Sequence, residues 1–111
     1  MTSILNWVRV SELSDISPDT GTLRVIVDSE AICLYRLEDG SIHATQDRCT
    51  HGNASLAEGY IDGGLIECPL HQGCFDIRTG EAVTAPCKVP IKVYAVRVED
   101  DVIYLSGVSA Q

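Results

Sequence analysis

CTHG at residues 49–52 and CPLHQGCFD at residues 68–76 decide the fold of this chain. Each stretch pairs one thiol with one imidazole at short spacing, and sixteen residues separate His51 from Cys68. Two such loops can converge on one metal centre. Two Cys and two His suit either a tetrahedral zinc ion or a [2Fe–2S] cluster with two His on one iron. The candidate ligands are therefore Cys49, His51, Cys68 and His71.

The spacing within the first stretch favours the iron–sulfur alternative. Zinc modules usually place two to four residues between paired ligands, whereas one residue separates Cys49 from His51. In a cluster with two irons, the two members of each loop can bind different metal ions. Gly52 and Gly73 flank the loops, and glycine permits a close approach of backbone N–H groups to sulfur.

Away from these loops, alternating apolar residues bounded by turn signals predict β-strands. We expect strands near 23–27, 31–37, 42–45, 91–98 and 102–105, with turns at Asp28-Ser29 and at Glu99-Asp100-Asp101. Strands joined by such short turns pair antiparallel. They predict a closed or sandwiched antiparallel base.

The middle of the chain has a different composition. Most of the Gly residues, three of the four Pro and four of the five Cys lie between Asp47 and Pro90. Only short strands are expected there, at 60–61, 65–67 and 75–77, with a helix of one or two turns at most at 54–58. A loop-rich segment with little core of its own needs metal binding to order it. We therefore expect one all-β domain spanning 1–111, with a base at 1–46 and 88–111 and a cluster-binding subdomain at 47–87.

The overall composition excludes several classes of protein. Sixteen acidic against eight basic residues give a formal charge of −8, which argues against nucleic-acid binding. We expect no membrane-spanning segment, because no apolar run approaches the roughly 18 residues that a span requires. We also expect no secretory signal, because the N-terminal stretch lacks a basic region followed by an apolar one. Five Cys without an export signal indicate metal or redox chemistry in a reducing, cytoplasmic compartment.

The remaining Cys and His residues receive structural interpretations. Cys33 is expected in the core, Cys74 and Cys87 as passive packing beside the site, and His43 on the surface. With His43 alone left over, the chain lacks the two His and carboxylate of a mononuclear iron oxygenase. It also lacks the G-x-G-x-x-G motif of a dinucleotide-binding fold. If the four candidate ligands hold an iron–sulfur cluster, what remains is a one-electron carrier and no enzyme.

From Trp7 to about Leu105 the chain resembles the small Rieske ferredoxins of bacterial multicomponent aromatic-ring-hydroxylating dioxygenases. The resemblance rests on the C-x-H and C-x-x-H motifs and extends to the turn at 79–82 and to Ala85-Pro86. It implies the Rieske fold: an antiparallel β-sandwich or barrel-like base with an inserted, loop-rich cluster-binding subdomain. It also implies one Rieske-type [2Fe–2S] cluster per chain. By position, the inner iron would be held by Cys49 and Cys68, the outer iron by His51 and His71, and Pro86 would lie in a covering loop.

Departures within the family predict a low reduction potential. Respiratory Rieske proteins carry a disulfide across the site, where this chain has Ala54 and Leu70. They also carry a Ser and a Tyr that bond to cluster sulfurs, where Gly73 and Phe75 stand here. Without those hydrogen bonds the potential is expected near the low end of the Rieske range, about −150 mV.

The function implied is a soluble electron carrier. It would pass one electron from an NAD(P)H-dependent flavoprotein reductase to a terminal Rieske non-haem iron oxygenase, and we expect a cytoplasmic monomer. Three alternatives stay open: a Rieske-type small subunit of a nitrite reductase, a zinc-stabilised binding module, and a donor to another class of oxygenase. The aromatic substrate would bind to the oxygenase, so this sequence does not name it.

Overall fold

The computed structural model describes residues 7–50, 52–70, 73–85 and 87–107, which fold into strands joined by short turns. In the described part of the chain the only helices are two 3₁₀ turns, η1 (Leu13–Asp15) and η2 (Leu56–Glu58). Neither is long enough to cross a bilayer. The strands are β1 (Val8–Glu12), β2 (Thr22–Val27), β3 (Glu30–Arg36), β4 (Ile42–Gln46), β5 (Tyr60–Asp62), β6 (Leu65–Glu67), β7 (Cys74–Asp76), β8 (Ala82–Thr84), β9 (Val93–Glu99) and β10 (Val102–Ser106).

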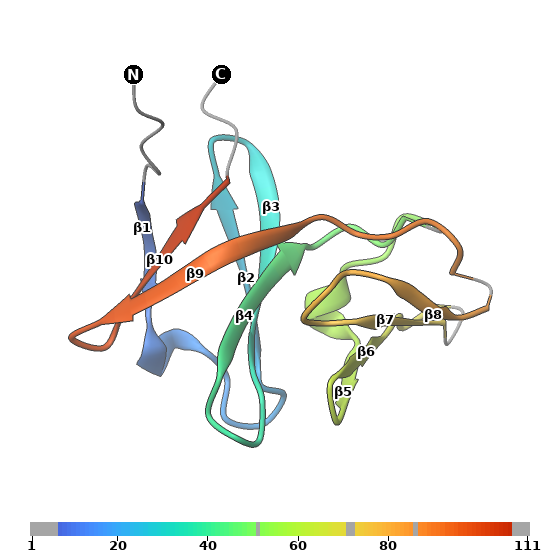
Figure 1. The fold of residues 1–111 in the computed structure, drawn as a ribbon, viewed down its shortest axis with the longest axis horizontal. Coiled ribbons are helices and arrows are strands. Elements are labelled where there is room, and N and C mark those ends of the chain that lie inside the picture. The colour runs from blue at the N-terminus through green and yellow to red at the C-terminus, as the bar shows by residue number, and fades with distance from the viewer. Residues whose placement is uncertain (1–6, 51, 71–72, 86, 108–111) are drawn as a thin grey trace.

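Six of these strands form the base sheet, in the order β1-β10-β9-β4-β3-β2 with every neighbouring pair antiparallel. The two edge strands, β1 and β2, contact each other, so the sheet is nearly closed into a barrel (Figure 1). The expected all-β, barrel-like base is thus confirmed.

The turns of the base follow directly from sequence. Asp28 and Ser29 have φ values of 49° and 69°, and Asp100 and Asp101 have φ values of 52° and 65°. Two successive residues with positive φ make the type I′ turn, whose twist matches that of the strands on either side. Asp is one of the residues that tolerates this conformation best. The five predicted base strands are confirmed, but β1 was not expected.

The remaining strands form a second, smaller sheet in the order β5-β6-β7-β8, which we call the insert sheet. In Figure 1 it lies beside the base, joined to it through the segments that follow β4 and precede β9. Those two strands pair directly, with Thr45 opposite Val93. Beyond the paired residues, the Gln46 N–H donates to the Lys92 carbonyl at 2.9 Å, and the Lys92 N–H donates to Gln46 Oε1 at 2.7 Å.

Strand β3 divides the hydrophobic interior into two cores. Its residues Ile32 to Tyr35 are all fully buried, and successive side chains point to opposite faces. One face contributes to the base core, which comprises Ile16, Ile32, Leu34, Ala44, Tyr94, Ile103 and Leu105. The other contributes to the insert core, which comprises Cys33, Tyr35, Leu37, Cys49, Ala54, Leu56, Ile66, Cys68, Phe75, Ile77, Cys87 and Ile91. The base therefore supplies one wall of the core around the predicted cluster cysteines.

Candidate metal centre

Two matched loops carry the predicted cysteine ligands. The Cys49 N–H donates to the Ala54 carbonyl at 3.0 Å, and the Cys68 N–H donates to the Gly73 carbonyl at 2.8 Å. Each bond closes a loop of six residues with the cysteine at its first position. Both cysteines are almost fully buried, at 1% and 0% exposure. The two thiols thus enter the same core from separate, similarly built loops.

The two histidines lie outside the described residues. His51 follows Cys49 by two positions, and His71 follows Cys68 by three, so each belongs by sequence to one of the closed loops. Pro86, expected in a covering loop, also lies outside the described residues. Their roles stay predictions.

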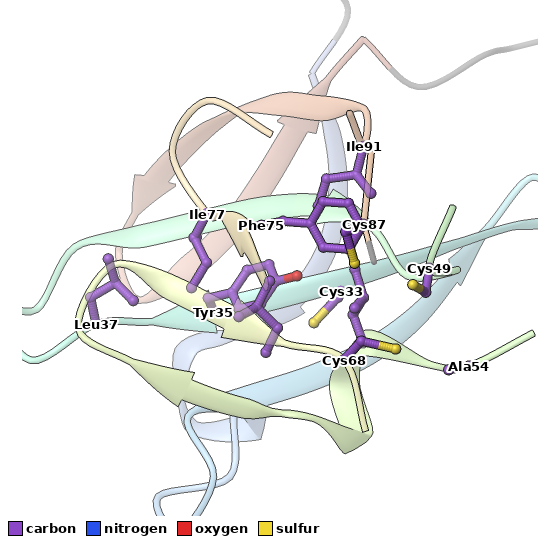
Figure 2. Packing of buried hydrophobic residues seen from close by; sticks show 12 residues of the cluster. Cys33, Tyr35, Leu37, Cys49, Ala54, Cys68, Phe75, Ile77, Cys87 and Ile91 are labelled. Carbon is purple, nitrogen blue, oxygen red and sulfur yellow. The ribbon is translucent and has the colours of Figure 1, made fainter. Parts of the chain in front are cut away.

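A third segment, around Cys87, meets the first loop. Thr50 Oγ1 donates to the Val89 carbonyl at 2.6 Å, which ties residues that are far apart in sequence. The Cys87 N–H donates to the Thr84 carbonyl at 3.1 Å, which fixes the turn after β8. Cys87 is 5% exposed and belongs to the same core as Cys49 and Cys68. Figure 2 shows Cys49, Cys68 and Cys87 grouped at one end of the insert core.

The surroundings of Cys87 strongly disfavour its thiolate. Burial raises the pKa of the Cys87 thiol to about 12, with a further contribution from neighbouring Cys49. Sequence reasoning placed Cys87 as passive packing beside the site, and its burial in the insert core agrees with that prediction.

Gly73 accommodates the Cys87 sulfur. A Cβ added at Gly73 would stand 2.4 Å from Cys87 Sγ and 3.0 Å from the Thr84 carbonyl oxygen. Any side chain at position 73 would collide with that sulfur. The sulfur beside position 73 belongs to Cys87, and the approach of a backbone N–H group to a cluster sulfur at this glycine stays a prediction.

A buried carboxylate holds the segment that leads into the loop of Cys49. Asp47 is 2% exposed; its side chain accepts hydrogen bonds from Arg24 Nε at 3.1 Å and from the Ala57 N–H at 3.0 Å. Its carbonyl accepts from the Leu56 N–H at 2.7 Å. Strand β2, through Arg24, and the turn η2 are thereby joined two residues before Cys49. Sequence reasoning used Asp47 only as a boundary and missed this role.

Cys33 and Cys74 are placed differently from the clustered thiols. Cys33 is fully buried, as expected, and its Sγ lies 3.7 Å from the Leu34 carbonyl oxygen. Burial raises its pKa. Cys74 is half-buried in β7, where desolvation raises its pKa and a contact with Thr84 opposes that effect.

His43 is half-buried, and so less solvated than expected. Its Nε2 lies 2.9 Å from Ser41 Oγ, near the turn between β3 and β4. Partial burial lowers the pKa of the imidazole, and the positive charge of Arg78 lowers it further.

Apolar side chains are exposed beside the buried cysteines. Leu70, two residues after Cys68, is 61% exposed, and Val89, two residues after Cys87, is 58% exposed. In both segments the chain therefore passes within two residues from the insert core to the surface.

The donor set fits an iron–sulfur group. Thiolates are the usual ligands of such clusters, and two buried thiols on loops closed by backbone hydrogen bonds provide them with little rearrangement. Within the described ranges no three His, Cys, Asp or Glu side chains form a metal-binding group. That the predicted His51 and His71 complete the set stays a prediction.

The family of this chain follows from a match over most of its length. A family model described as Rieske [2Fe-2S] domain matches residues 6–95. The chain belongs to the Rieske [2Fe–2S] family. Its cofactor is thus a Rieske-type [2Fe–2S] cluster, and the zinc-stabilised module is set aside. This agrees with the donor set and with the nearly closed β base.

Similar proteins in this family are ferredoxins of dioxygenase systems. Ferredoxin CarAc of Metapseudomonas resinovorans is 43% identical over 103 residues, which cover 91% of this chain and 94% of that protein. The ferredoxin component of a naphthalene 1,2-dioxygenase system from Pseudomonas putida is 45% identical over 96 residues, covering 86% of this chain and 90% of that protein. In a solved complex of reduced oxygenase and oxidized ferredoxin in carbazole 1,9a-dioxygenase, the matching chain is 40% identical with a TM-score of 0.80. The match covers 95% of this chain and 96% of that chain.

Proposed function

We propose that this chain is the ferredoxin of an aromatic-ring dioxygenase system. It accepts one electron from a flavoprotein reductase that oxidises NADH or NADPH, and delivers that electron to a terminal oxygenase. The observation that carries the proposal is the 40% identical chain found in complex with a dioxygenase's oxygenase. A [2Fe–2S] cluster supplies the one-electron chemistry when bound.

In this proposal Cys49 and Cys68 hold the inner iron and His51 and His71 hold the outer iron. The burial of both cysteines supports their place at the inner side. The exposure of Leu70, between Cys68 and His71 in sequence, supports a site that reaches the surface along this loop. Electron transfer between proteins requires such an exposed end.

The chain's own residues would then perform three tasks. The backbone bonds that close the loops at Cys49 and Cys68 hold the ligand sulfurs in place. Asp47 and Arg24 fix the first loop to the base. Exposed Leu70 and Val89 offer apolar area to a docking protein, while the rest of the strongly acidic surface keeps the carrier soluble. We propose that it works as a monomer in the cytoplasm.

The experiment is a reconstituted electron-transfer assay. The purified protein is titrated anaerobically with dithionite, and one electron per chain with an EPR signal of low average g is expected. Reduced protein is then mixed with a carbazole- or naphthalene-type oxygenase holding its aromatic substrate. Product formation from NADH and a flavoprotein reductase should require this protein. Replacement of His71 by Ser should abolish the EPR signal, and an unchanged signal would remove His71 from the ligand set.

The alternative assignment to a nitrite reductase predicts a different result. A small subunit of that enzyme would co-purify stably with a sirohaem-containing partner and would not support hydroxylation. Elution as a free chain that reduces the oxygenase contradicts that alternative. Reduction of an oxygenase of another class, with none by the ring-hydroxylating enzymes, would move the assignment to that class.

A further inference from the structure

Gln46, the last residue of β4, holds the point where the chain leaves the base for the insert. Its N–H donates to the Lys92 carbonyl at 2.9 Å, and its side-chain Oε1 accepts from the Lys92 N–H at 2.7 Å. Lys92 directly precedes β9, so both of its main-chain polar groups bond to Gln46. The departing and returning segments, which lie side by side in Figure 1, are thus joined through one residue.

The nitrogen of the same side-chain amide reaches the loop of Cys49. Gln46 Nε2 donates to the Arg48 carbonyl at 2.8 Å. That carbonyl and the Cys49 N–H belong to one planar peptide unit, and the Cys49 N–H donates to the Ala54 carbonyl at 3.0 Å. Both polar groups of the peptide that leads into Cys49 are therefore held, the N–H by the loop itself and the carbonyl by a side chain of the base.

We propose that Gln46 is a positioning residue for the cluster, because its amide fixes the peptide between Arg48 and Cys49 and so directs the Cys49 side chain toward iron. This inference rests on the proposed role of Cys49 as a ligand. A planar peptide held at both its carbonyl and its N–H restricts the backbone torsions on either side of it. Groups that orient a ligand without touching the metal contribute to metal affinity.

The two bonds of the side chain require a neutral amide. The Lys92 N–H is a donor and needs an acceptor, whereas the Arg48 carbonyl is an acceptor and needs a donor. A glutamate has the same length, but its carboxylate only accepts, so Gln46→Glu keeps the bond to Lys92 and loses the bond to Arg48. Gln46→Leu loses both bonds. The two variants therefore separate orientation of the cysteine from pairing of the two segments.

The test measures the rate at which the cluster-loaded full-length protein loses iron to an excess of chelator, followed by decay of the visible absorption of the cluster. Both Gln46→Glu and Gln46→Leu should lose iron about fivefold faster than wild type, the effect expected from one hydrogen bond. Gln46 is half-buried and belongs to neither hydrophobic core, so both variants should fold.

The matched control is Thr22→Val, which keeps the shape of the side chain. Thr22 Oγ1 donates to the Ala57 carbonyl at 2.8 Å, so it also joins the base to the insert segment, but at a distance in sequence from the Cys49 peptide. Its rate of iron loss should equal that of wild type. A second readout is the resonance Raman spectrum of the oxidised cluster, because its Fe–S stretching bands report the geometry at the cysteine sulfurs. These bands should shift in both Gln46 variants and stay in place in Thr22→Val.

The outcomes separate this inference from the proposed function. A normal Rieske EPR signal in Cys49→Ala would refute the ligand assignment of Cys49 itself. With that assignment intact, a wild-type rate and unshifted bands in Gln46→Glu refute only the positioning role, and an effect confined to Gln46→Leu assigns Gln46 to the pairing of the two segments instead. Equal acceleration in Thr22→Val also refutes the positioning role, because it would show that any weakened attachment of the insert releases iron.

Discussion

The base and the insert differ in what holds them together. The base core consists of aliphatic residues, one Ala and one Tyr, and its strands are five to seven residues long. The insert core contains four cysteines, and the strands of its sheet are three residues each. Short strands bury little apolar surface and provide few ladder hydrogen bonds. The difference indicates that the base is stable through packing alone, whereas the insert depends on its cofactor.

Removal of the cluster should give the largest difference in local stability between the insert and the base. In Cys68→Ser, or after anaerobic chelation of iron, amide exchange in β5 to β8 should become more than about tenfold faster, which equals a loss of about 1.4 kcal/mol of local stability. Exchange in β3 and β10 should change much less. Hydrogen-exchange mass spectrometry measures both sheets in one sample. Equal acceleration in the two sheets would show that they form one cooperative unit.

Matched truncations in the two cores test whether the stability of the insert depends on the cluster. Leu34 in the base core and Ile66 in the insert core are both fully buried, so Leu34→Ala and Ile66→Ala should each cost about 2–5 kcal/mol in the loaded protein. In cluster-free protein the cost at Leu34 should persist, and the cost at Ile66 should fall because its surroundings are already disordered. Urea unfolding of wild type and of both variants, each with and without the cluster, gives these differences. An undiminished cost at Ile66 would contradict a cofactor-dependent insert.

A steric change inside the insert should have a moderate effect. Gly73→Ala places a Cβ against Cys87 Sγ and should cost about 1–3 kcal/mol of stability through overpacking. Adding Cys87→Ala removes the sulfur and should recover part of that loss, which a double-mutant cycle quantifies. Gly64→Ala is the control, because only the flexible end of Arg78 lies near its added Cβ, at 3.3 Å. A strictly additive double mutant would mean that the clash lies elsewhere.

The smallest expected effect is a pH dependence at His43. Partial burial and Arg78 lower its pKa in the folded state, with Asp39 and Asp76 acting in the opposite direction. The unfolded chain therefore takes up a proton near pH 6.5 while the folded protein does not, and stability falls as the pH drops below that value. His43→Gln should flatten this part of the curve, measured as the difference between variant and wild-type unfolding free energies. Identical pH profiles would exclude the contribution of His43.

Much of the base was predictable because its signals are local. The alternation from Leu23 to Val27 and the Asp-Ser and Asp-Asp turns depend only on neighbouring residues. Strand β1 escaped prediction because its pairing with β10 is irregular between Arg9 and Ser11, which interrupts a period of two. Asp47 resembles a solvated acid in sequence, and its burial depends on Arg24 and Ala57 arriving from other elements.

The features of the site also divide into local ones, which the sequence predicts, and non-local ones, which it does not. The C-x-H and C-x-x-H spacings are local, and they favoured an iron–sulfur cluster over zinc before the family match decided between them. The placement of Cys49 and Cys87 in one core is not local, because 37 residues separate the two positions and the whole insert sheet lies between them. No spacing rule predicts this shared burial, which only the folded insert creates.

The direct pairing of β4 with β9 has a consequence for evolution and design. Seen from the base, residues 47–92 are an elongated loop of an antiparallel hairpin, whose two ends leave from adjacent, hydrogen-bonded positions at Gln46 and Lys92. Insertions or deletions within such a loop need not alter the register of the strands that flank it. A redox module built in this way is portable, because any barrel with two neighbouring antiparallel strands offers the same attachment points.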